Sequence, residues 1–351
     1  MQDDKTTRLR EQLRDSLCSL TREFGSSFPV RPEKAAEHRI LSESEFQKCY
    51  PELQTLCHYT DAAGLAGILK SGTFWATNAA FLNDPEEFLF AYRVFESMVR
   101  RGEHALDKRL AGAFMEGVHT SGHDNELDRI YLISFSAHRD DLSQFRAYSD
   151  NARGYALEFE PCKLIQALND YIEHGSGEYL TLRKVRYGRE DLAKFHKRAI
   201  DLLKSSIEEL PYPRDSQEFL SAVRGFGFDL HNYLREAGVV FKQEGYKSEE
   251  EFRVVLDIHG LMSVLPCDLN ERIAVRVRNA LPVPYIPFQF LPSLQQDGSF
   301  FRRDSTAGLQ RIVVGPGLDF DLAKTGLFYL LRENGLLEVD IQASKCSYRS
   351  W

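Results

Sequence analysis

The sequence lacks the patterns that mark the common cofactor-binding and hydrolytic enzymes. It has no G-x-G-x-x-G or Walker phosphate loop, no G-x-S-x-G nucleophile motif and no H-E-x-x-H zinc motif. Its six cysteines are scattered along the chain without a C-x-x-C pair. Dinucleotide-binding Rossmann domains, P-loop enzymes, α/β-hydrolases, zinc clusters and disulfide-bonded frameworks are therefore unsupported, and we expect free thiols.

Long apolar runs and an excess of positive charge are missing as well. No run of about 18 apolar residues is present to cross a bilayer, and the N-terminus has no apolar signal-peptide core. The formal net charge of -8 disfavours a general nucleic-acid coat, because phosphate binding needs clustered lysines and arginines. The basic residues at positions 183–189 predict either a solvated strand face or a local contact with phosphates. We expect a cytoplasmic protein that does not associate with membranes.

The composition is that of a packed globular protein. Hydrophobic residues make up 43% and aromatic residues 12% of the 351 residues. Residues 6–24 repeat leucine and phenylalanine at three- to four-residue spacing, which predicts an amphipathic helix. We expect residues 1–50 to form an N-terminal helical preface and residues 51–351 to form a single α+β domain with helical insertions.

Predicted strands are more numerous than a helical bundle would need. They lie at residues 53–59, 73–77, 130–136, 154–159, 180–187, 239–241, 252–258, 272–277, 286–290 and 310–314. Helices are predicted at residues 61–70, 88–101, 109–118, 141–149, 164–173, 189–209, 219–237 and 323–334. Because the helices do not alternate regularly with the strands, the predicted class is α+β with a mixed or antiparallel sheet.

The segment His58-Tyr59-Thr60 is the most informative polar feature. It ends a predicted strand, and Asp61 follows as the expected N-cap of a helix that stops at Gly72. A histidine at a strand end beside a cleft can hydrogen-bond a sugar hydroxyl. The alternative is a core histidine that bonds to the backbone. We interpret the segment as one wall of a polar ligand site.

A second polar feature opens a predicted strand nearly two hundred residues later. Strand alternation predicts that Glu249, Glu251 and Arg253 share one face while Phe252 faces the core. Two carboxylates and an arginine on one face can hold and polarise a sugar, and an exposed acidic strand end is the alternative. We predict that this segment forms the other wall of the site.

Two further stretches contain groups that bind ligands or metals in other proteins. Residues 83–87, Asn-Asp-Pro-Glu-Glu, predict a turn before a helix, with a ligand-facing loop as the alternative. His119 and His123 have the spacing of two metal ligands on a helix, but Ser121 and Gly122 favour a loop. We therefore predict no metal site.

In these segments the chain resembles a bacterial family known only as domain of unknown function 2971. The resemblance runs from about residue 56 to the C-terminus. The residues that carry it are Cys57-His58-Tyr59-Thr60, Ile68-Leu69-Lys70-Ser71-Gly72, Phe74-Trp75-Ala76-Thr77, Asn83-Asp84-Pro85-Glu86-Glu87, Ser134-Phe135-Ser136, Phe145 to Tyr148, Gly154, Lys242, Glu249 to Arg253, Arg311 to Pro316 and Ser344-Lys345. The family label implies no activity.

The opening of this pattern is also similar to that of the H-Y-E type ADP-ribosyltransferases and related nucleic-acid-modifying toxins. In those enzymes the histidine binds a ribose of NAD, a tyrosine stacks on nicotinamide, and a glutamate on a late strand holds the other ribose. The resemblance implies these roles for His58, Tyr148 and Glu251, with His58 and Glu251 catalytic and NAD as the substrate. The side chains that it implies for NAD binding are His58, Tyr59, Thr60, Thr77, Asn83, Ser136, Tyr148, Glu249 and Arg253.

Three functions follow as expectations. The resemblance implies an NAD-dependent ADP-ribosyltransferase, a toxin or antiviral defence effector that modifies nucleic acid or protein and whose partner would be an antitoxin or another protein. A fixed carboxylate such as Glu251 would stabilise the oxocarbenium-like charge of that reaction without a metal. The second is a noncatalytic module that binds a nucleotide or a partner. The third is a nucleic-acid-processing enzyme with Asp84, Glu249 and Glu251 around a magnesium ion.

Overall fold

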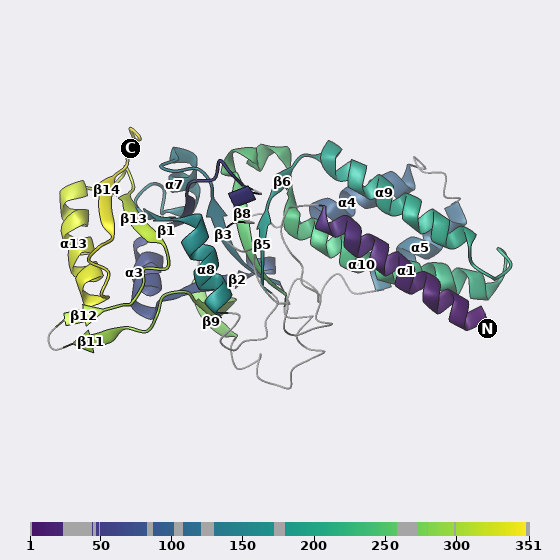
Figure 1. Cartoon of the computed structure of the whole chain (residues 1–351). Coiled ribbons are helices and arrows are strands. Elements are labelled where there is room, and N and C mark those ends of the chain that lie inside the picture. Colours follow the sequence, from purple (N-terminus) through teal and green to yellow (C-terminus); the bar gives the residue numbers. More distant parts are fainter. Residues whose placement is uncertain are drawn as a thin grey trace. The chain divides into compact units, whose positions relative to one another are not determined.

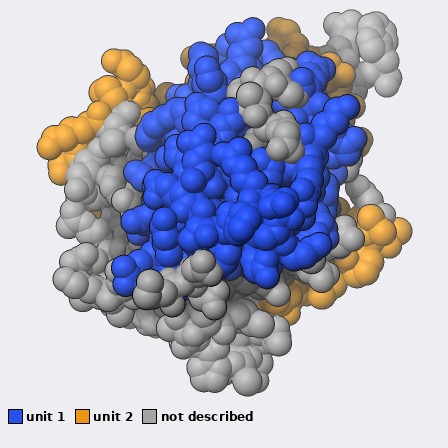
Figure 2. Space-filling model, turned by 90° about the vertical axis from the view of Figure 1, so that its right-hand side faces the viewer, with its two compact units in different colours: residues 1–27, 80–128, 183–248 blue, residues 28–79, 129–182, 249–351 orange. Residues whose placement is uncertain are grey.

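The computed structural model describes residues 2–23, 44, 47–48, 50–82, 87–101, 108–120, 130–171, 180–257, 273–278, 280–297 and 300–348. The chain forms two compact units, coloured separately in Figure 2. The helical unit comprises Met1–Ser27, Ala80–Asp128 and Arg183–Ser248, and the sheet unit comprises Phe28–Ala79, Arg129–Leu182 and Glu249–Trp351. The division into residues 1–50 and 51–351 stays a prediction, because most of residues 24–49 lie outside the described part.

The helical unit is built on long amphipathic helices (Figure 1). These are α1 (Gln2–Arg22), α4 (Glu87–Arg100), α5 (Lys108–Thr120), α9 (Arg189–Glu208) and α10 (Gln217–Val240). The predicted leucine repeat of α1 is confirmed by its buried members Leu9, Leu13, Leu17 and Leu20. Asp229 of α10 fixes α1 further, because it accepts hydrogen bonds from Arg10 and Arg14 at 2.6 and 2.7 Å. Among the described helices, none is long and apolar enough to cross a membrane.

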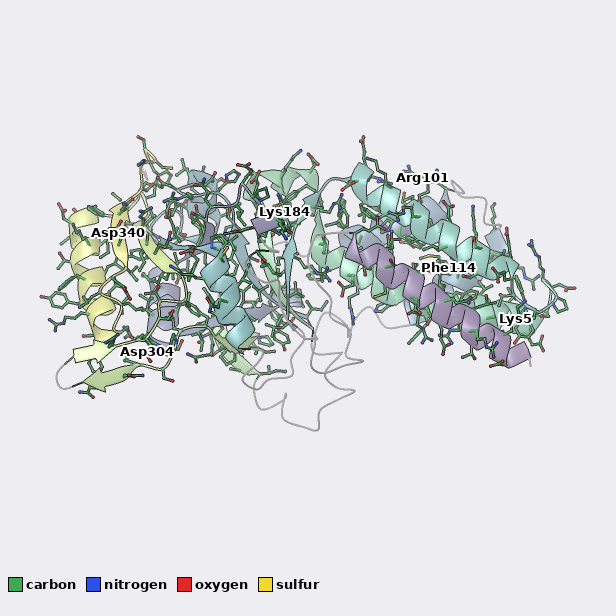
Figure 3. All side chains as sticks on the ribbon, in the orientation of Figure 1. Lys5, Arg101, Phe114, Lys184, Asp304 and Asp340 are labelled. Carbon is green, nitrogen blue, oxygen red and sulfur yellow. The ribbon has the colours of Figure 1, made fainter. Side chains whose placement is uncertain are left out.

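Helix α10 continues through Gly225 and Gly227, two residues that weaken a helix. Close packing on α5 explains Gly227, because a Cβ there would lie 2.3 Å from the carbonyl oxygen of Phe114. Phe114 is a buried residue of α5 and is labelled in Figure 3. The prediction of a strand at residues 239–241 is wrong. Helix α10 runs on to Val240, and the short strand β7 (Phe241–Lys242) starts only after it.

The sheet unit contains a ten-stranded mixed sheet (Figure 1), except for Arg183 and Lys184 at the end of strand β5. Its strands are β1 (Leu56–Thr60), β2 (Thr73–Asn78), β3 (Ile130–Ser136), β4 (Tyr155–Phe159), β5 (Leu180–Lys184), β8 (Glu251–Asp257), β9 (Ala274–Arg278), β10 (Leu281–Gln289), β13 (Leu309–Val314) and β14 (Asp340–Ala343). Their order is β14-β13-β4-β1-β3-β2-β10-β9, and β8 pairs with β3 and β5. Strands β13 and β14 pair in parallel, whereas β3 pairs antiparallel with β1, β2 and β8. The predicted α+β class with a mixed sheet is therefore confirmed.

The capping signals around β1 and β3 are confirmed. The carboxylate of Asp61 accepts a hydrogen bond from the Gly64 amide at 2.7 Å and caps α3 (Ala62–Ser71). Gly72 closes that helix with a φ of 69°, a left-handed conformation that favours glycine. Asp141 caps α7 (Leu142–Tyr148) in the same way as Asp61 caps α3. The remaining long helices of the sheet unit are α8 (Pro161–Tyr171) and α13 (Phe320–Glu333).

Strand β3 is the centre of the arrangement that positions the polar residues. One edge of β3 pairs with β8 along its full length, from Ile130 opposite Asp257 to Ser136 opposite Glu251. Strands β1 and β2 therefore share the other edge, and both run antiparallel to β3. Strand β1 pairs there only through Cys57, opposite Ser136, and β2 pairs only up to Leu132. We call the gap in strand pairing between these two points the β1–β2 fork.

The two faces of β1 are packed differently. A large apolar core that includes Leu56, Phe74 and Phe135 lies on the face of Leu56. Cys57 and Tyr59 point to the opposite face and pack in a smaller apolar cluster. Alternation along β1 thus separates Tyr59 from its sequence neighbours.

In the helical unit, His196 of α9 is fully buried and hydrogen-bonded through both ring nitrogens. Its Nε2 donates to the carbonyl of Ala91 at 3.0 Å, so its Nδ1, 3.1 Å from the Tyr233 hydroxyl, must be the acceptor of that contact. Burial lowers the pKa of His196 to about 3, and the hydrogen bond to Ala91 opposes this only in part. The ring is therefore neutral at pH 7.

This buried histidine predicts a loss of stability in mild acid. Below pH 6.5 the unfolded chain protonates His196, whereas the folded chain does not until the pH approaches about 3. The free energy of unfolding should then fall by up to about 1.4 kcal/mol per pH unit from this residue. Melting temperatures between pH 7 and 5 should decline less steeply in His196→Gln than in the wild type. Equal slopes, or the same flattening in a variant of the exposed His119, would contradict the prediction.

Candidate functional site

His58 fills the β1–β2 fork. Its Nδ1 lies 2.9 Å from the carbonyl oxygen of Ser134, the residue of β3 between the partners of β1 and β2. The ring also contacts Phe74 and Phe135, at centroid distances of 5.1 and 5.7 Å. Because a carbonyl only accepts, Nδ1 carries the proton and Nε2 presents a lone pair.

The electrostatics of the fork keep this imidazole neutral. Burial is the largest cause that lowers the pKa of His58 below 6.5, and the positive charge of Arg276 lowers it further. The hydrogen bond to Ser134 opposes both effects. At pH 7 the ring is thus a fixed hydrogen-bond acceptor and not a cation.

One face of β3 collects several of the predicted site residues. Opposite residues of an antiparallel pair carry their side chains on the same face, and successive residues alternate. Thr77 is opposite Leu132, Arg253 is opposite Ser134, and Glu251 is opposite Ser136. These side chains consequently share a face, on which Ser134 is exposed. The sequence prediction did not include Ser134, although the alternation in Ser134-Phe135-Ser136 places both serines together.

Ser136, Tyr148 and Glu249 are brought together at the end of this face. The Ser136 hydroxyl donates to the carbonyl of Glu249 at 2.6 Å and accepts from the amide of His138 at 3.1 Å. The Tyr148 hydroxyl donates to Glu249 Oε1 at 2.5 Å. The Tyr148 hydroxyl thus holds a carboxylate. The resemblance implied a different role for this residue, the stacking of its ring on nicotinamide.

Glu251 and Arg253 form a buried bidentate ion pair. Nε and Nη2 of Arg253 each donate to one Glu251 oxygen at 2.9 Å, and the two side chains are 1% and 7% exposed. Their common face and the inward position of Phe252 confirm the predicted alternation. Glu249 does not continue it, because it ends the 3-10 helix η4 (Glu244–Glu249) and Glu250 has a φ of 38°.

The remaining predicted residues take no part in these contacts. The Tyr59 hydroxyl is engaged with the backbone, as it donates to the His138 carbonyl and accepts from the Asp141 amide. Thr60 ends β1 on the same side as His58. Asn83 lies outside the described residues, as does Asp84. His58 itself alternates onto the face of β1 opposite to that of Cys57 and Glu251, and only its ring reaches the edge of β3.

Arg276 on β9 is the residue at the fork that the sequence did not predict. Its Nη2 donates to the Thr77 hydroxyl at 2.8 Å. The guanidinium lies over the rings of Trp75 and Tyr285, 5.2 and 5.8 Å from their centroids. Pairing of β2 with β10 and of β10 with β9 brings these residues together.

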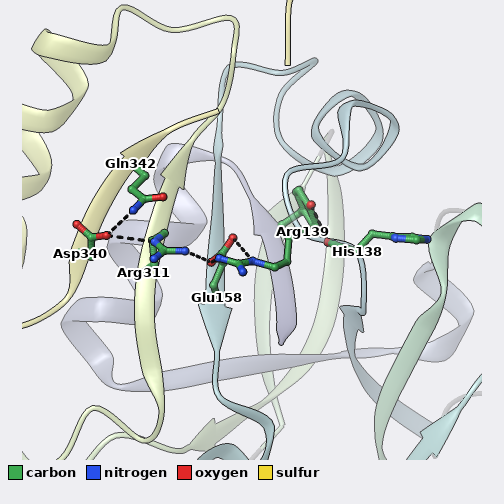
Figure 4. Close-up of polar contacts among 7 residues, drawn as sticks. His138, Arg139, Glu158, Arg311, Asp340 and Gln342 are labelled. Atoms are coloured by element: carbon green, nitrogen blue, oxygen red, sulfur yellow. Dashed lines mark hydrogen bonds and ion pairs between the residues drawn. The ribbon is translucent and has the colours of Figure 1, made fainter. Parts of the chain in front are cut away.

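A second polar group crosses the sheet on the Cys57 face (Figure 4). Glu158 of β4 is 2% exposed and accepts hydrogen bonds from Arg139 at 2.8 Å and Arg311 at 3.0 Å. Arg311 also donates to Asp340, which accepts from Gln342. Every charge in this row has a partner of opposite sign, so the row ties β4, β13 and β14 together.

Within the described ranges, no group of three or more His, Cys, Asp or Glu side chains is arranged to hold a metal ion. The interpretation of the His119 and His123 spacing as a loop and not as a metal site stays a prediction, because His123 lies outside the described residues. Glu158 and Glu251 are both neutralised by arginines. The described polar groups of this face are therefore arginine–glutamate pairs and hydroxyls, while the imidazole of His58 reaches the edge of β3 from the opposite face of β1.

Comparison with known proteins finds a match of part of the chain to one family model, and that match carries no activity. Residues 144–254 match the model of the family described as Protein of unknown function (DUF2971), which confirms the predicted resemblance over roughly a third of the chain. The matched stretch includes Tyr148, Glu249, Glu251 and Arg253 but not His58. No curated protein matches the chain. No solved structure matches it either.

The buried pair predicts a large stability effect at the carboxylate that the resemblance assigns to catalysis. Glu251→Gln should lower the free energy of unfolding by about 3 kcal/mol, because Arg253 would keep its charge in a buried position without its main partner. Urea unfolding measures this loss, and Glu251→Leu with Arg253→Met should recover most of it. The control is Asp150→Asn, which breaks an exposed pair with Arg153 and should cost less than about 1 kcal/mol. Equal losses of unfolding free energy in Glu251→Gln and Asp150→Asn would contradict the prediction.

Proposed function

We propose that the sheet unit binds NAD at the β1–β2 fork and transfers its ADP-ribose to an acceptor. The observation that carries the proposal is the neutral imidazole of His58, held by the Ser134 carbonyl at a gap in strand pairing. Its Nε2 is then an acceptor of fixed direction, suited to a ribose hydroxyl. This is the role that the resemblance to H-Y-E type ADP-ribosyltransferases implies for the histidine.

The proposed reaction breaks the bond between C1′ of the ribose and the nicotinamide nitrogen. Nicotinamide leaves with the electron pair of that bond, and the positive charge moves from its ring to the ribose. A nucleophile of the acceptor then attacks C1′ and loses its proton to solvent or to a base. Carboxylates stabilise the transient charge, and Glu251 and Glu249 are those near the end of the β3 face. His58 orients the ribose and transfers no proton.

The acceptor class proposed is nucleic acid or protein, and the setting is that of a toxin or antiviral defence effector with a protein partner. The ADP-ribosyltransferase resemblance supports this part of the proposal.

The second candidate is a module that binds a nucleotide without turnover. One observation favours it: Glu251 is already neutralised by Arg253 within a buried pair. A carboxylate that is engaged in this way contributes less to stabilising a developing positive charge than an unpaired one. The two candidates share the fork as the binding site and differ in whether nicotinamide is released.

Nicotinamide release from NAD tests the proposal directly. Wild-type protein incubated with NAD and cell lysate should release nicotinamide, and His58→Ala should lower kcat/KM about tenfold by removing the ribose acceptor. His119→Ala, on an exposed surface of the helical unit, is the matched control and should retain full activity. Equal rates for His58→Ala and wild type, with equal melting temperatures, would sink the assignment. Binding of NAD with no release by the wild type would favour the noncatalytic module.

The two nearby glutamates separate catalysis from stability. Glu249→Gln keeps an oxygen that accepts from the Tyr148 hydroxyl, so we expect its melting temperature to stay within a few degrees of wild type. If the Glu249 carboxylate stabilises the transition state, this variant should lose at least about tenfold in kcat while remaining folded. Unchanged turnover in Glu249→Gln would leave Glu251 as the only proposed carboxylate, to be tested at temperatures where Glu251→Gln is folded.

A further inference from the structure

Arg276 has far more hydrogen-bonding capacity than its surroundings use. A guanidinium has five N–H donors, and the described residues accept a single hydrogen bond from this one, between Nη2 and Thr77. Its Nε is buried without a partner. No described carboxylate forms an ion pair with Arg276, in contrast to Arg253, Arg139 and Arg311.

An arginine of this kind is costly in the folded protein. A partly buried cation is normally paired with a carboxylate, because its lost hydration must be replaced. Burial is the largest cause that lowers the pKa of Arg276, and the charge of Arg278 adds to it. The Trp75 and Tyr285 rings offset part of this cost through their π faces but accept no strong hydrogen bond.

The same contacts fix the direction of the guanidinium. The hydrogen bond to Thr77 and the two ring faces hold it on β9 opposite Val283, next to the strand that pairs with β2. Trp75 and Tyr285 are themselves packed together, with centroids 5.0 Å apart. The site is therefore pre-organised, and a ligand would meet a planar fork of donors that needs little ordering.

We propose that Arg276 is an anion subsite that binds the pyrophosphate of a nucleotide whose ribose lies at His58. That the ligand is a nucleotide rests on the proposed function. That Arg276 binds an anion rests on its guanidinium, which forms no ion pair with a described carboxylate. A pyrophosphate is negatively charged and has several oxygens that can accept from Nη1 and Nη2 at once, whereas a ribose or an adenine base brings no negative charge to the guanidinium. Nucleosides without phosphate should gain nothing from this residue.

Binding of ADP-ribose, which has the pyrophosphate but no nicotinamide to lose, tests the subsite without catalysis. The chain has two tryptophans, so Trp351→Phe leaves Trp75 as a fluorescent reporter beside Arg276. In this background Arg276→Gln should weaken ADP-ribose binding about tenfold or more and leave adenosine binding within about twofold. The affinity for ADP-ribose should also fall as salt is raised, and less so in the variant.

Arg278→Gln is the matched control, because Arg278 is exposed on the same strand and its loss changes the net charge equally. It should bind ADP-ribose within about twofold of the background protein. Arg276→Lys retains the charge without the planar fork and should show an intermediate affinity, which guards against a folding defect in Arg276→Gln.

Equal ADP-ribose affinity in Arg276→Gln and the background protein overturns the inference, and so does an equal loss in Arg278→Gln. Arg276-dependent binding of ADP-ribose by a protein that releases no nicotinamide from NAD upholds the subsite and overturns the transferase. If the protein releases nicotinamide and Arg276→Gln leaves the KM for NAD unchanged, the transferase is upheld and the anion subsite is overturned.

Discussion

The candidate site depends on a limit of strand pairing: β3 has two edges and three partner strands. Because β8 occupies one edge along its whole length, β1 and β2 must divide the other. Backbone groups between their contact points lack a continuous partner strand and need other partners. The Ser134 carbonyl finds one in the imidazole of His58. A requirement of the backbone therefore fixes the tautomer and direction of the side chain that we propose to contact the ligand.

The elements around the fork could be predicted from the sequence because their signals are local. Asp61 and Gly72 delimit α3 through contacts with residues at most four positions away, and strand alternation predicted the shared face of Glu251 and Arg253. Alternation failed at Glu250, whose positive φ turns Glu249 out of the strand pattern. A positive φ at a glutamate has no reliable signature in a single sequence. The predicted common face of Glu251 and Arg253 is therefore confirmed, and its extension back to Glu249 is wrong.

The cation at the fork could not be predicted, because its position depends on strand register between distant segments. Arg276 is 199 residues from Thr77 in the sequence and reaches it through two successive strand pairings, β2 with β10 and β10 with β9. A shift of one residue in either pairing would turn the arginine to the other face. The same holds for Glu158 and Arg311, which are 153 residues apart. A single sequence shows these charged residues but not which of them become neighbours in the sheet.

The buried and partly buried polar groups of the sheet unit differ in how fully the protein itself satisfies them, and that difference indicates where a ligand would gain most. Glu158 and Glu251 are each held by arginines, so their capacity serves the stability of the sheet. His58 and Arg276 use one ring nitrogen and one donor, respectively, within the described residues. A ligand that supplied a hydroxyl and an anion would remove a desolvation cost at the fork, whereas at Glu251 it would first have to break an ion pair. Binding free energy should therefore be concentrated at the fork. In the proposed transfer reaction, the carboxylates of Glu249 and Glu251 would act mainly through the electrostatic field that they exert on the positive charge of the ribose.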